Sequence, residues 1–278
     1  MTKKNIAEKF FFASDDSKYY DDTIELTVPR YRLIHRTMID LLNCYFKVQL
    51  NNKYRDAKGI ILDVGAGSGN ESIRIMKQFS KMNTLAIDLC EPMKNLYERN
   101  YNDRINRSGN KEEKRFQYVV EDIRRINKDD ERIDAYYKSL NQSACKVAIS
   151  AYCIHHYSLE EKNAIYQKMY DLLEPGGILI IMDLFTYGSE QISQDAHSFD
   201  IEFIKREFDN PSFKKSELIP KEQRERLKHK WVNHMETAHC LEPVEQRIEI
   251  LKEMRFENVE CVLKYWQQGV IRATKPTK

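Results

Sequence analysis

The sequence predicts an α/β protein with a mainly parallel sheet and helices on both faces. From Gly59 onward, short apolar runs alternate with amphipathic helical patterns. Most of the nine glycines gather in two short segments, and acidic residues follow the ends of the first apolar runs. Strands that alternate with helices favour parallel pairing through right-handed crossovers. We therefore expect one large α/β domain with additional helical segments.

Residues 1–55 are expected to form an N-terminal helical cap segment, and residues 56–278 the α/β domain. Pro29 suits the first turn of a helix. Apolar side chains follow it at helical spacing: Tyr31, Ile34, Met38, Leu41 or Leu42, and Tyr45. This helix has one apolar face to bury, so we expect it to flank the domain.

Seven strands are expected in the domain, five of them in alternation with helices. The five fall at residues 60–64, 84–88, 116–120, 146–151 and 178–184, and the helix before the fifth ends at Pro175-Gly176-Gly177. After a helix over 244–254, residues 258–265 and 269–273 are expected to pair as antiparallel strands that close the sheet.

The alternation is interrupted by an insertion at about residues 186–240, which we interpret as a helical lid over a substrate. Apolar side chains at helical spacing predict two helices in it. The two sets are Phe199, Phe203 and Phe208, and Leu227, Trp231 and Met235. Packing alone also explains both sets, so the lid function is a hypothesis.

The composition excludes several classes of protein. The chain has 278 residues, 41% of them hydrophobic, and a net charge of +2. It is globular, and it lacks the strong positive charge typical of nucleic-acid binding, although nucleic acid is not excluded. We find no membrane span and no signal-peptide core, so we expect a cytoplasmic protein. The six cysteines are expected to be free thiols. A homodimer is an open alternative to a monomer.

A glycine-rich turn follows the first strand. It reads D-x-G-x-G-x-G from Asp63 to Gly69, and it opens a helix. Such glycines let a ligand approach the backbone, and the helix N-terminus supplies free N–H groups. A dinucleotide fingerprint would require a third glycine at position 70, which is Asn70. The turn therefore disfavours nicotinamide and flavin cofactors.

Polar side chains follow the next strands. Asp88 comes at the end of the second strand, where a carboxylate can accept both hydroxyls of a ribose. Asp122 and Ile123 follow the third strand and suit the amine and the ring of an adenine. Ser150 ends the fourth strand. Matching residues at four successive strand ends indicate an adenosine-containing ligand.

With these motifs, residues 59–185 resemble the class I S-adenosylmethionine-dependent methyltransferases. The resemblance rests on DVGAGSG, on Asp88 after TLAI, on EDI at 121–123, and on LLEPGGILIIMD at 172–183. It implies a Rossmann-like seven-stranded methyltransferase sheet and S-adenosyl-L-methionine as cofactor. The expected cofactor contacts are Tyr31, Asp63, Gly65, Ala66, Gly67, Asp88, Leu89, Asp122, Ile123 and Ser150.

A narrower resemblance covers most of the chain. The run TIELTVPRYRLIHRTM looks like the entry segment of the carboxy-S-adenosylmethionine synthase family, in which Tyr31 would reach over the cofactor. Ser150 occupies a position where that family uses Asn. The family's lid arginine, which pairs with the extra carboxylate of its cofactor, is replaced at about the same place by Val232. Neighbouring cations that could substitute are Arg224, Arg226 and Lys230.

We therefore predict transfer of a methyl group from S-adenosylmethionine to a small-molecule acceptor, with release of S-adenosylhomocysteine. One alternative is an enzyme like carboxy-S-adenosylmethionine synthase that serves tRNA wobble-uridine modification. Another is a protein that binds S-adenosylmethionine without catalysis.

Two histidines are the candidates for proton removal from the acceptor. His155 and His156 lie just past the fourth strand, on the edge where ligands bind in open sheets. Packing and helix capping also explain a His-His pair there. With Asp183 and His197 they could in principle bind a metal, but the spacing matches no recognised metal motif, so no metal is predicted.

Overall fold

The structure is a computed structural model that describes residues 14–105, 114–126, 130–210, 219–237 and 240–277. The first 13 residues of the expected cap segment lie outside this range. One seven-stranded sheet organises the chain, in the order β3-β2-β1-β4-β5-β7-β6. Its strands are β1 Lys58–Val64, β2 Lys81–Asp88, β3 Phe116–Val120, β4 Cys145–Ala151, β5 Leu173–Leu184, β6 Glu257–Tyr265 and β7 Gln268–Thr274.

The first five strands are parallel, and β7 lies antiparallel to β5 and to β6. This confirms the expected α/β fold with its antiparallel closing pair. The central strand β1 is buried from Gly59 to Val64. Apart from Asp63, its buried residues are apolar or glycine, which is typical of a parallel strand covered on both faces.

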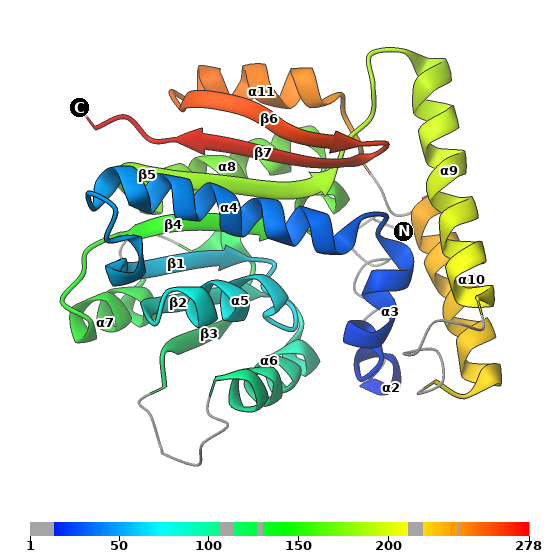
Figure 1. The fold of residues 1–278 in the computed structure, drawn as a ribbon, viewed down its shortest axis with the longest axis horizontal. Coiled ribbons are helices and arrows are strands. Elements are labelled where there is room, and N and C mark those ends of the chain that lie inside the picture. Colours follow the sequence, from blue (N-terminus) through cyan, green and yellow to red (C-terminus); the bar gives the residue numbers. More distant parts are fainter. Residues whose placement is uncertain (1–13, 106–113, 127–129, 211–218, 238–239, 278) are drawn as a thin grey trace.

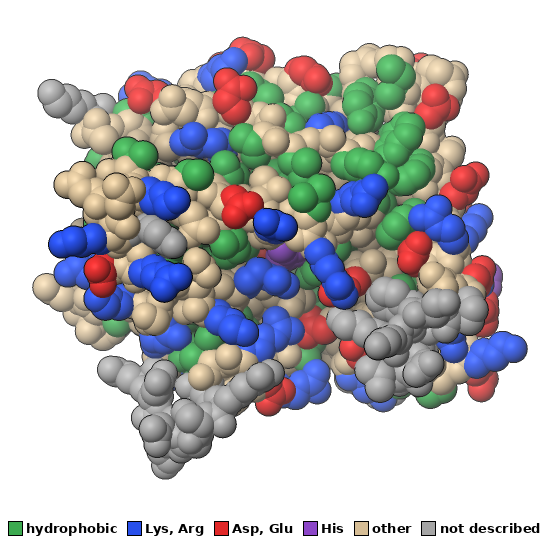
Figure 2. Space-filling model, viewed as in Figure 1, with side chains coloured by type: hydrophobic (Ala, Val, Ile, Leu, Met, Phe, Trp, Pro, Cys, Tyr) green, Lys and Arg blue, Asp and Glu red, His purple; other side chains and the backbone are tan. Residues whose placement is uncertain are grey.

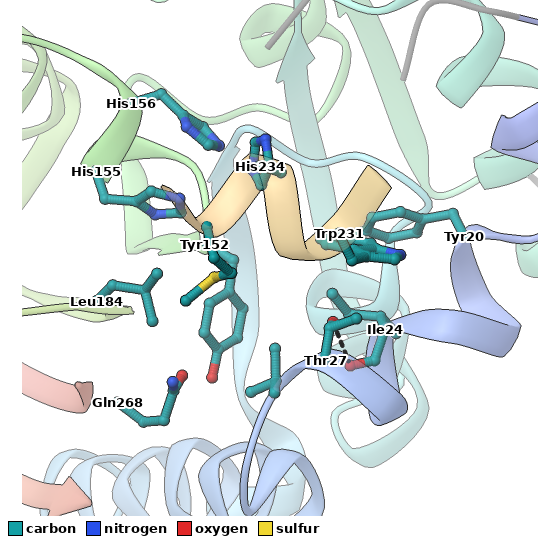
Figure 3. A pocket seen from close by; sticks show the side chains of 12 residues that line it. Tyr20, Ile24, Thr27, Tyr152, His155, His156, Leu184, Trp231, His234 and Gln268 are labelled. Atoms are coloured by element: carbon teal, nitrogen blue, oxygen red, sulfur yellow. Dashed lines mark hydrogen bonds between the residues drawn. The ribbon is translucent and has the colours of Figure 1, made fainter. Parts of the chain in front are cut away.

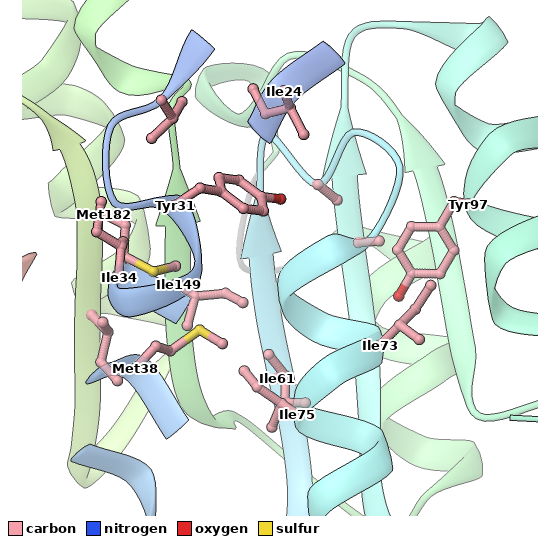
Figure 4. Close-up of a cluster of buried hydrophobic side chains, with 14 of the residues drawn as sticks. Ile24, Tyr31, Ile34, Met38, Ile61, Ile73, Ile75, Tyr97, Ile149 and Met182 are labelled. Carbon is pink, nitrogen blue, oxygen red and sulfur yellow. The ribbon is translucent and has the colours of Figure 1, made fainter. Parts of the chain in front are cut away.

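Helices cover both faces of the sheet (Figure 1). One face carries α4 Tyr31–Gln49, α5 Asn70–Gln78 and α6 Glu91–Arg104, and the other carries α7 Glu131–Ser139, α8 Leu159–Leu172 and α11 Val244–Glu253. On the first face, Ile34 and Met38 of α4 pack toward Met182 and Ile149 of the sheet (Figure 4).

Two local features differ from the sequence expectation. The helix α7 was not expected; Asp130 caps it by accepting a hydrogen bond from the Arg132 backbone N–H, and Ile133 is buried against the sheet. The strand β5 begins at Leu173, before the glycine pair, so that Gly176, with φ of 78°, lies within it. The glycine therefore admits a bend inside the strand.

The remaining helices gather at the carboxyl end of the parallel strands (Figure 1). They are α2 Ser14–Ser17 and α3 Tyr20–Thr27 from the N-terminal segment, and α9 Glu190–Asp209 and α10 Lys221–Thr237 from the insertion. The two insertion helices match the two predicted from apolar spacing. Together with the expected ligand edge of the sheet, these helices form the surroundings of the candidate site.

The N-terminal segment is tied to the insertion by one buried carboxylate. Asp16 of α2 accepts hydrogen bonds from Gln223 at 3.1 Å and from Arg226 Nη1 at 3.0 Å, and it also pairs with Lys230. All three partners belong to α10. This cluster, the Asp16 clamp, holds α10 over the carboxyl end of the sheet.

Charge is distributed unevenly over the surface. On the face that carries α4 and α5, Lys and Arg side chains gather near the middle (Figure 2). Exposed cations of these two helices include Arg32, Arg36, Arg74 and Lys77. In the described part of the chain, no helix combines the length and apolar character needed to cross a membrane. All six cysteines are free, as expected.

Candidate active site

The glycine-rich turn connects β1 to α5 at the carboxyl edge of the sheet. Gly65, Gly67 and Gly69 all have positive φ, of 72°, 49° and 79°. A Cβ on Gly65 would lie 2.3 Å from the Cys153 Sγ, whereas one on Gly67 would meet only the Gly65 carbonyl oxygen at 3.9 Å. The turn is thus closed behind Gly65 and open beside Gly67, where a ligand can approach the backbone.

Three carboxylates surround this turn. Asp63 is buried, and its Oδ2 has no hydrogen-bond partner among the described residues. Burial raises the pKa of Asp63 well above its usual range, and the nearby Glu71 and Asp88 carboxylates raise it further. A cationic ligand would offset this repulsion. The sulfonium and ammonium groups of S-adenosylmethionine therefore fit the charge and the unpartnered oxygen of the site.

Asp88 lies at the end of β2, directly beside the glycine turn. Its Oδ2 accepts a hydrogen bond from the Gly67 N–H and its Oδ1 one from the Cys90 N–H, both at 2.8 Å. Burial raises its pKa, and these backbone hydrogen bonds partly oppose that effect. A carboxylate has about four acceptor sites, so both oxygens can still accept ribose hydroxyls. Leu89, the next residue, is half-buried.

The expected adenine contacts follow β3. Ile123 is buried and begins the short helix η2 Ile123–Arg125. Asp122 is also buried, but its carboxylate is paired with Arg124, whose Nε lies 3.0 and 3.1 Å from the two oxygens. Arg124 in turn pairs with Glu161 of α8. An adenine amine at Asp122 would therefore share a carboxylate that already has a guanidinium partner.

Ser150 and Tyr31 complete the expected cofactor residues. The Ser150 hydroxyl is buried and donates to the Val64 carbonyl at 2.8 Å, so it ties β4 to β1. The Tyr31 ring is buried and packs on His35 with ring centroids 4.1 Å apart. It lies between Ile24 of α3 and the sheet (Figure 4). Burial raises the pKa of Tyr31, and the Glu71 carboxylate nearby raises it further.

Sequence reasoning missed a second clamp, which fixes the glycine turn. The Asp21 carboxylate of α3 accepts hydrogen bonds from Ser68 Oγ at 2.6 Å, Asn70 Nδ2 at 2.7 Å and Asn100 Nδ2 at 2.6 Å. Asn70, the residue that departs from the dinucleotide fingerprint, thus binds the N-terminal segment. No local sequence signal links Asp21 to a turn 47 residues away.

A small cavity of about 50 Å³ lies beyond the glycine turn, at the carboxyl ends of β4 and β5 (Figure 3). Both the N-terminal segment and α10 contribute to its wall. Its lining residues are Tyr20, Ile24, Thr27, Val28, Tyr152, His155, His156, Leu184, Trp231, His234, Met235 and Gln268. Burial raises the pKa of Tyr20, and the carboxylates of Glu71, Asp21 and Asp88 add to this rise. Tyr20 therefore lies near both the glycine turn and the cavity.

Both candidate catalytic histidines line this cavity. His155 and His156 belong to η3 Ile154–His156, after β4. The buried Asp183 carboxylate at the end of β5 pairs with His155 Nδ1 and accepts from the His155 N–H at 3.1 Å. Burial raises the pKa of Asp183 to about 6 and lowers that of His155 well below its usual range, with His156 and Lys162 adding to the latter effect.

A third histidine joins the pair. His234 of α10 lies beside His156, with ring centroids 4.9 Å apart (Figure 3). His197, which the sequence offered together with Asp183 as a possible metal ligand, is not in the histidine group that the described residues form. The feature of the sequence that could have identified His234 is its position on the apolar face of α10, which also carries Trp231.

The lid cations differ in their surroundings. Arg226 and Lys230 belong to the Asp16 clamp. Val232 is half-buried and packs against the apolar core. Arg224 has a buried Nε that makes no hydrogen bond within the described part of the chain.

Comparisons with known proteins agree with this geometry. A family model described as a methyltransferase domain matches residues 61–177. The chain is 21% identical, over 98% of its own length and 98% of the relative's, to the carboxy-S-adenosyl-L-methionine synthase of Helicobacter hepaticus.

Two solved structures share the fold. Magnesium protoporphyrin IX methyltransferase from Synechocystis, with bound S-adenosylhomocysteine, has a TM-score of 0.58 at 12% identity and covers 98% of this chain and 99% of its own. An O-methyltransferase family protein from Burkholderia thailandensis has a TM-score of 0.56 at 11% identity. The match covers 97% of this chain and 62% of that protein.

The seven-stranded sheet and the glycine turn with its carboxylates agree with the matched methyltransferase domain. The cofactor of this methyltransferase domain is S-adenosylmethionine. Residues 61–177 match a methyltransferase domain, and the whole chain shares the fold of solved class I S-adenosylmethionine-dependent methyltransferases.

Proposed function

We propose that this enzyme transfers the methyl group to a small molecule whose reacting atom lies in the cavity beside the histidines. The observation that carries the proposal is that Tyr20 lies near both the glycine turn and this cavity. When bound, S-adenosylmethionine supplies a methyl group on a sulfonium, which is already activated, so the protein's main task is to align the acceptor.

The cavity wall supports an acceptor with an aromatic or apolar body and a few polar atoms. Ile24, Trp231 and Met235 supply apolar surface. The Gln268 side chain is buried, and its Oε1 makes no hydrogen bond within the described residues, so it can accept one from the acceptor. Since α3 and α10 enclose the cavity, a small molecule suits it better than a polymer. The matched Synechocystis enzyme also acts on a small molecule, by its name.

The histidines face the acceptor's reacting atom in this arrangement. His155 is held by Asp183 through Nδ1, and its side chain lines the cavity. His156 and His234 complete the polar end of the wall. We infer that these histidines handle the proton or the lone pair of the acceptor, in agreement with the sequence prediction for His155 and His156.

Calorimetry with S-adenosylmethionine and S-adenosylhomocysteine tests the cofactor half of the proposal. Asp88→Ala is expected to weaken binding about tenfold to a hundredfold, since it removes charged acceptors from the ribose site. Asp40→Ala, which removes an exposed carboxylate of α4, should bind like the wild type. Equal affinities for the wild type and Asp88→Ala would contradict the assignment.

A labelled methyl donor tests the acceptor half. Metabolite extracts incubated with pure enzyme should yield labelled small molecules, and Trp231→Ala should reduce labelling because it removes a cavity wall. If label appears only in macromolecules, the small-molecule proposal is wrong.

The second candidate is synthesis of carboxy-S-adenosylmethionine, favoured by the full-length relative and by Arg224. The buried Nε of Arg224 makes no hydrogen bond within the described residues, so its N–H could donate to an additional carboxylate. Arg226 and Lys230 already pair with Asp16, which argues against either of them binding the additional carboxylate. Mass spectrometry of any ligand retained through purification distinguishes the candidates, because the carboxylated cofactor is heavier.

A further inference from the structure

Three histidines from two distant segments meet at one end of the cavity. His155 and His156 come from η3 and His234 from α10. Each offers a ring nitrogen, and these nitrogens all lie within 4.8 Å of one another. The rings of His155 and His156 have centroids 3.9 Å apart, and Figure 3 shows the His234 side chain directed toward the pair.

The orientation of His155 is fixed as it is for metal-binding imidazoles. Its Nδ1 pairs with Asp183, whose carboxylate also accepts from the His155 and Leu184 backbone N–H groups at 3.1 and 3.0 Å. Nε2 is then the nitrogen that can bind a metal. A carboxylate behind a ligating histidine fixes the ring and increases its basicity.

A buried polar network supports the same segment. The Cys240 N–H donates to the His155 carbonyl at 2.8 Å. Lys162, only 2% exposed, pairs with Glu242 and with the Cys240 carbonyl. Arg247 donates to Glu242 at 2.7 and 2.9 Å. The backbone that carries His155 is thus joined rigidly to the segment after α10, as a preorganised ligand site requires.

We propose that His155, His156 and His234 bind a divalent transition metal ion of the zinc class, with a fourth position open to the cavity. Three imidazoles with an open position are typical of catalytic zinc sites, and nitrogen donors favour zinc, cobalt, nickel or copper over magnesium and calcium. Tetrahedral zinc places its nitrogens about 3.4 Å apart. Small rotations of His156 and His234 would achieve this.

This inference rests on the proposed function and makes the role of the histidines specific. The metal ion would bind an oxygen or nitrogen of the acceptor at its open position and hold it in the cavity. His155 and His156 would then act as ligands rather than as free bases. Trp231, whose ring lies edge-on to His234 at 5.8 Å, would limit the movement of that ligand.

Titration of the tag-free full-length protein with Co²⁺ tests the site, because tetrahedral or five-coordinate Co²⁺ absorbs visible light strongly. The wild type should bind one equivalent, and Zn²⁺ should displace it. His156→Ala and His234→Ala should each weaken binding by about tenfold or more, and Asp183→Asn by about 10- to 100-fold. His229→Ala, which removes an exposed histidine of the same helix, is the matched control.

Thermal unfolding and calorimetry with S-adenosylmethionine, measured on every variant, show whether each one is folded. Absence of the Co²⁺ spectrum in a wild-type protein that binds S-adenosylmethionine would overturn the metal site and leave the proposed function intact. A spectrum unchanged by His156→Ala and His234→Ala would also overturn it. Failure of the wild type to bind S-adenosylmethionine would instead count against the proposed function.

Discussion

Asp200 of the lid helix α9 provides a quantitative test of how this structure responds to pH. The side chain is fully buried, and its Oδ2 accepts a hydrogen bond from Gln268 Nε2 at 3.0 Å. Its Oδ1 makes no hydrogen bond within the described residues. Burial raises the pKa of Asp200 from 3.8 to about 7, although the Gln268 hydrogen bond and the charge of Lys264 oppose the rise.

A raised carboxyl pKa makes the folded protein less stable as the pH increases. Between the unfolded and folded pKa values the folded state binds more protons, so the free energy of unfolding decreases as the pH rises from about 4 to about 7. At 1.36 kcal/mol per pKa unit, the total loss attributable to Asp200 is about 4 kcal/mol. About 2–3 kcal/mol of it falls between pH 5 and pH 8.

Asp200→Asn should remove this dependence, because the amide does not ionise. Urea unfolding at pH 5 and pH 8 gives the free energies of wild type and variant. Relative to the wild type, we expect the variant to gain about 2–3 kcal/mol of unfolding free energy between the two pH values. Asp195→Asn, an exposed position on the same helix, is the control. A difference between Asp200→Asn and wild type that is the same at both pH values would refute the reasoning.

Three further predictions concern the glycine turn and the two clamps. Gly65→Ala should lower the free energy of unfolding by about 1–3 kcal/mol, because Gly65 has a positive φ and a Cβ there would clash with the Cys153 thiol. Calorimetry should also show weaker S-adenosylmethionine binding. Gly188→Ala, with open space around it, should change neither. Asp16→Asn should lower the free energy of unfolding by about 1–2 kcal/mol and accelerate proteolysis of α10; unchanged cleavage would contradict the clamp. Asp21→Ala should weaken S-adenosylmethionine binding about tenfold, since Ser68 and Asn70 at the turn and Asn100 of α6 lose their hydrogen bonds to α3. An unaltered affinity would show that the turn is rigid without Asp21.

The sheet and the glycine turn could be predicted from the sequence because each depends on the pattern of a few neighbouring residues. The run from Ile60 to Val64 is apolar except for Asp63, as expected of a strand buried on both faces, and the glycines after it allow positive φ. The apolar spacing around Trp231 likewise predicted α10. The exceptions were α7 and the start of β5 at Leu173, where short or mixed patterns leave helix and strand ends ambiguous.

The contents of the site were decided by tertiary packing. The sequence placed His155 and His156 at the sheet edge, but only the docking of α10 brings His234 to them. Likewise, only the fold shows that Asp122 pairs with the Arg124 guanidinium. It also shows that Asp16 pairs with both Arg226 and Lys230 of α10. Local periodicity shows which face of a helix is buried but not which distant side chain it meets. The sequence by itself therefore determined the fold class and the cofactor edge, and the tertiary structure determined which groups line the cavity beside it.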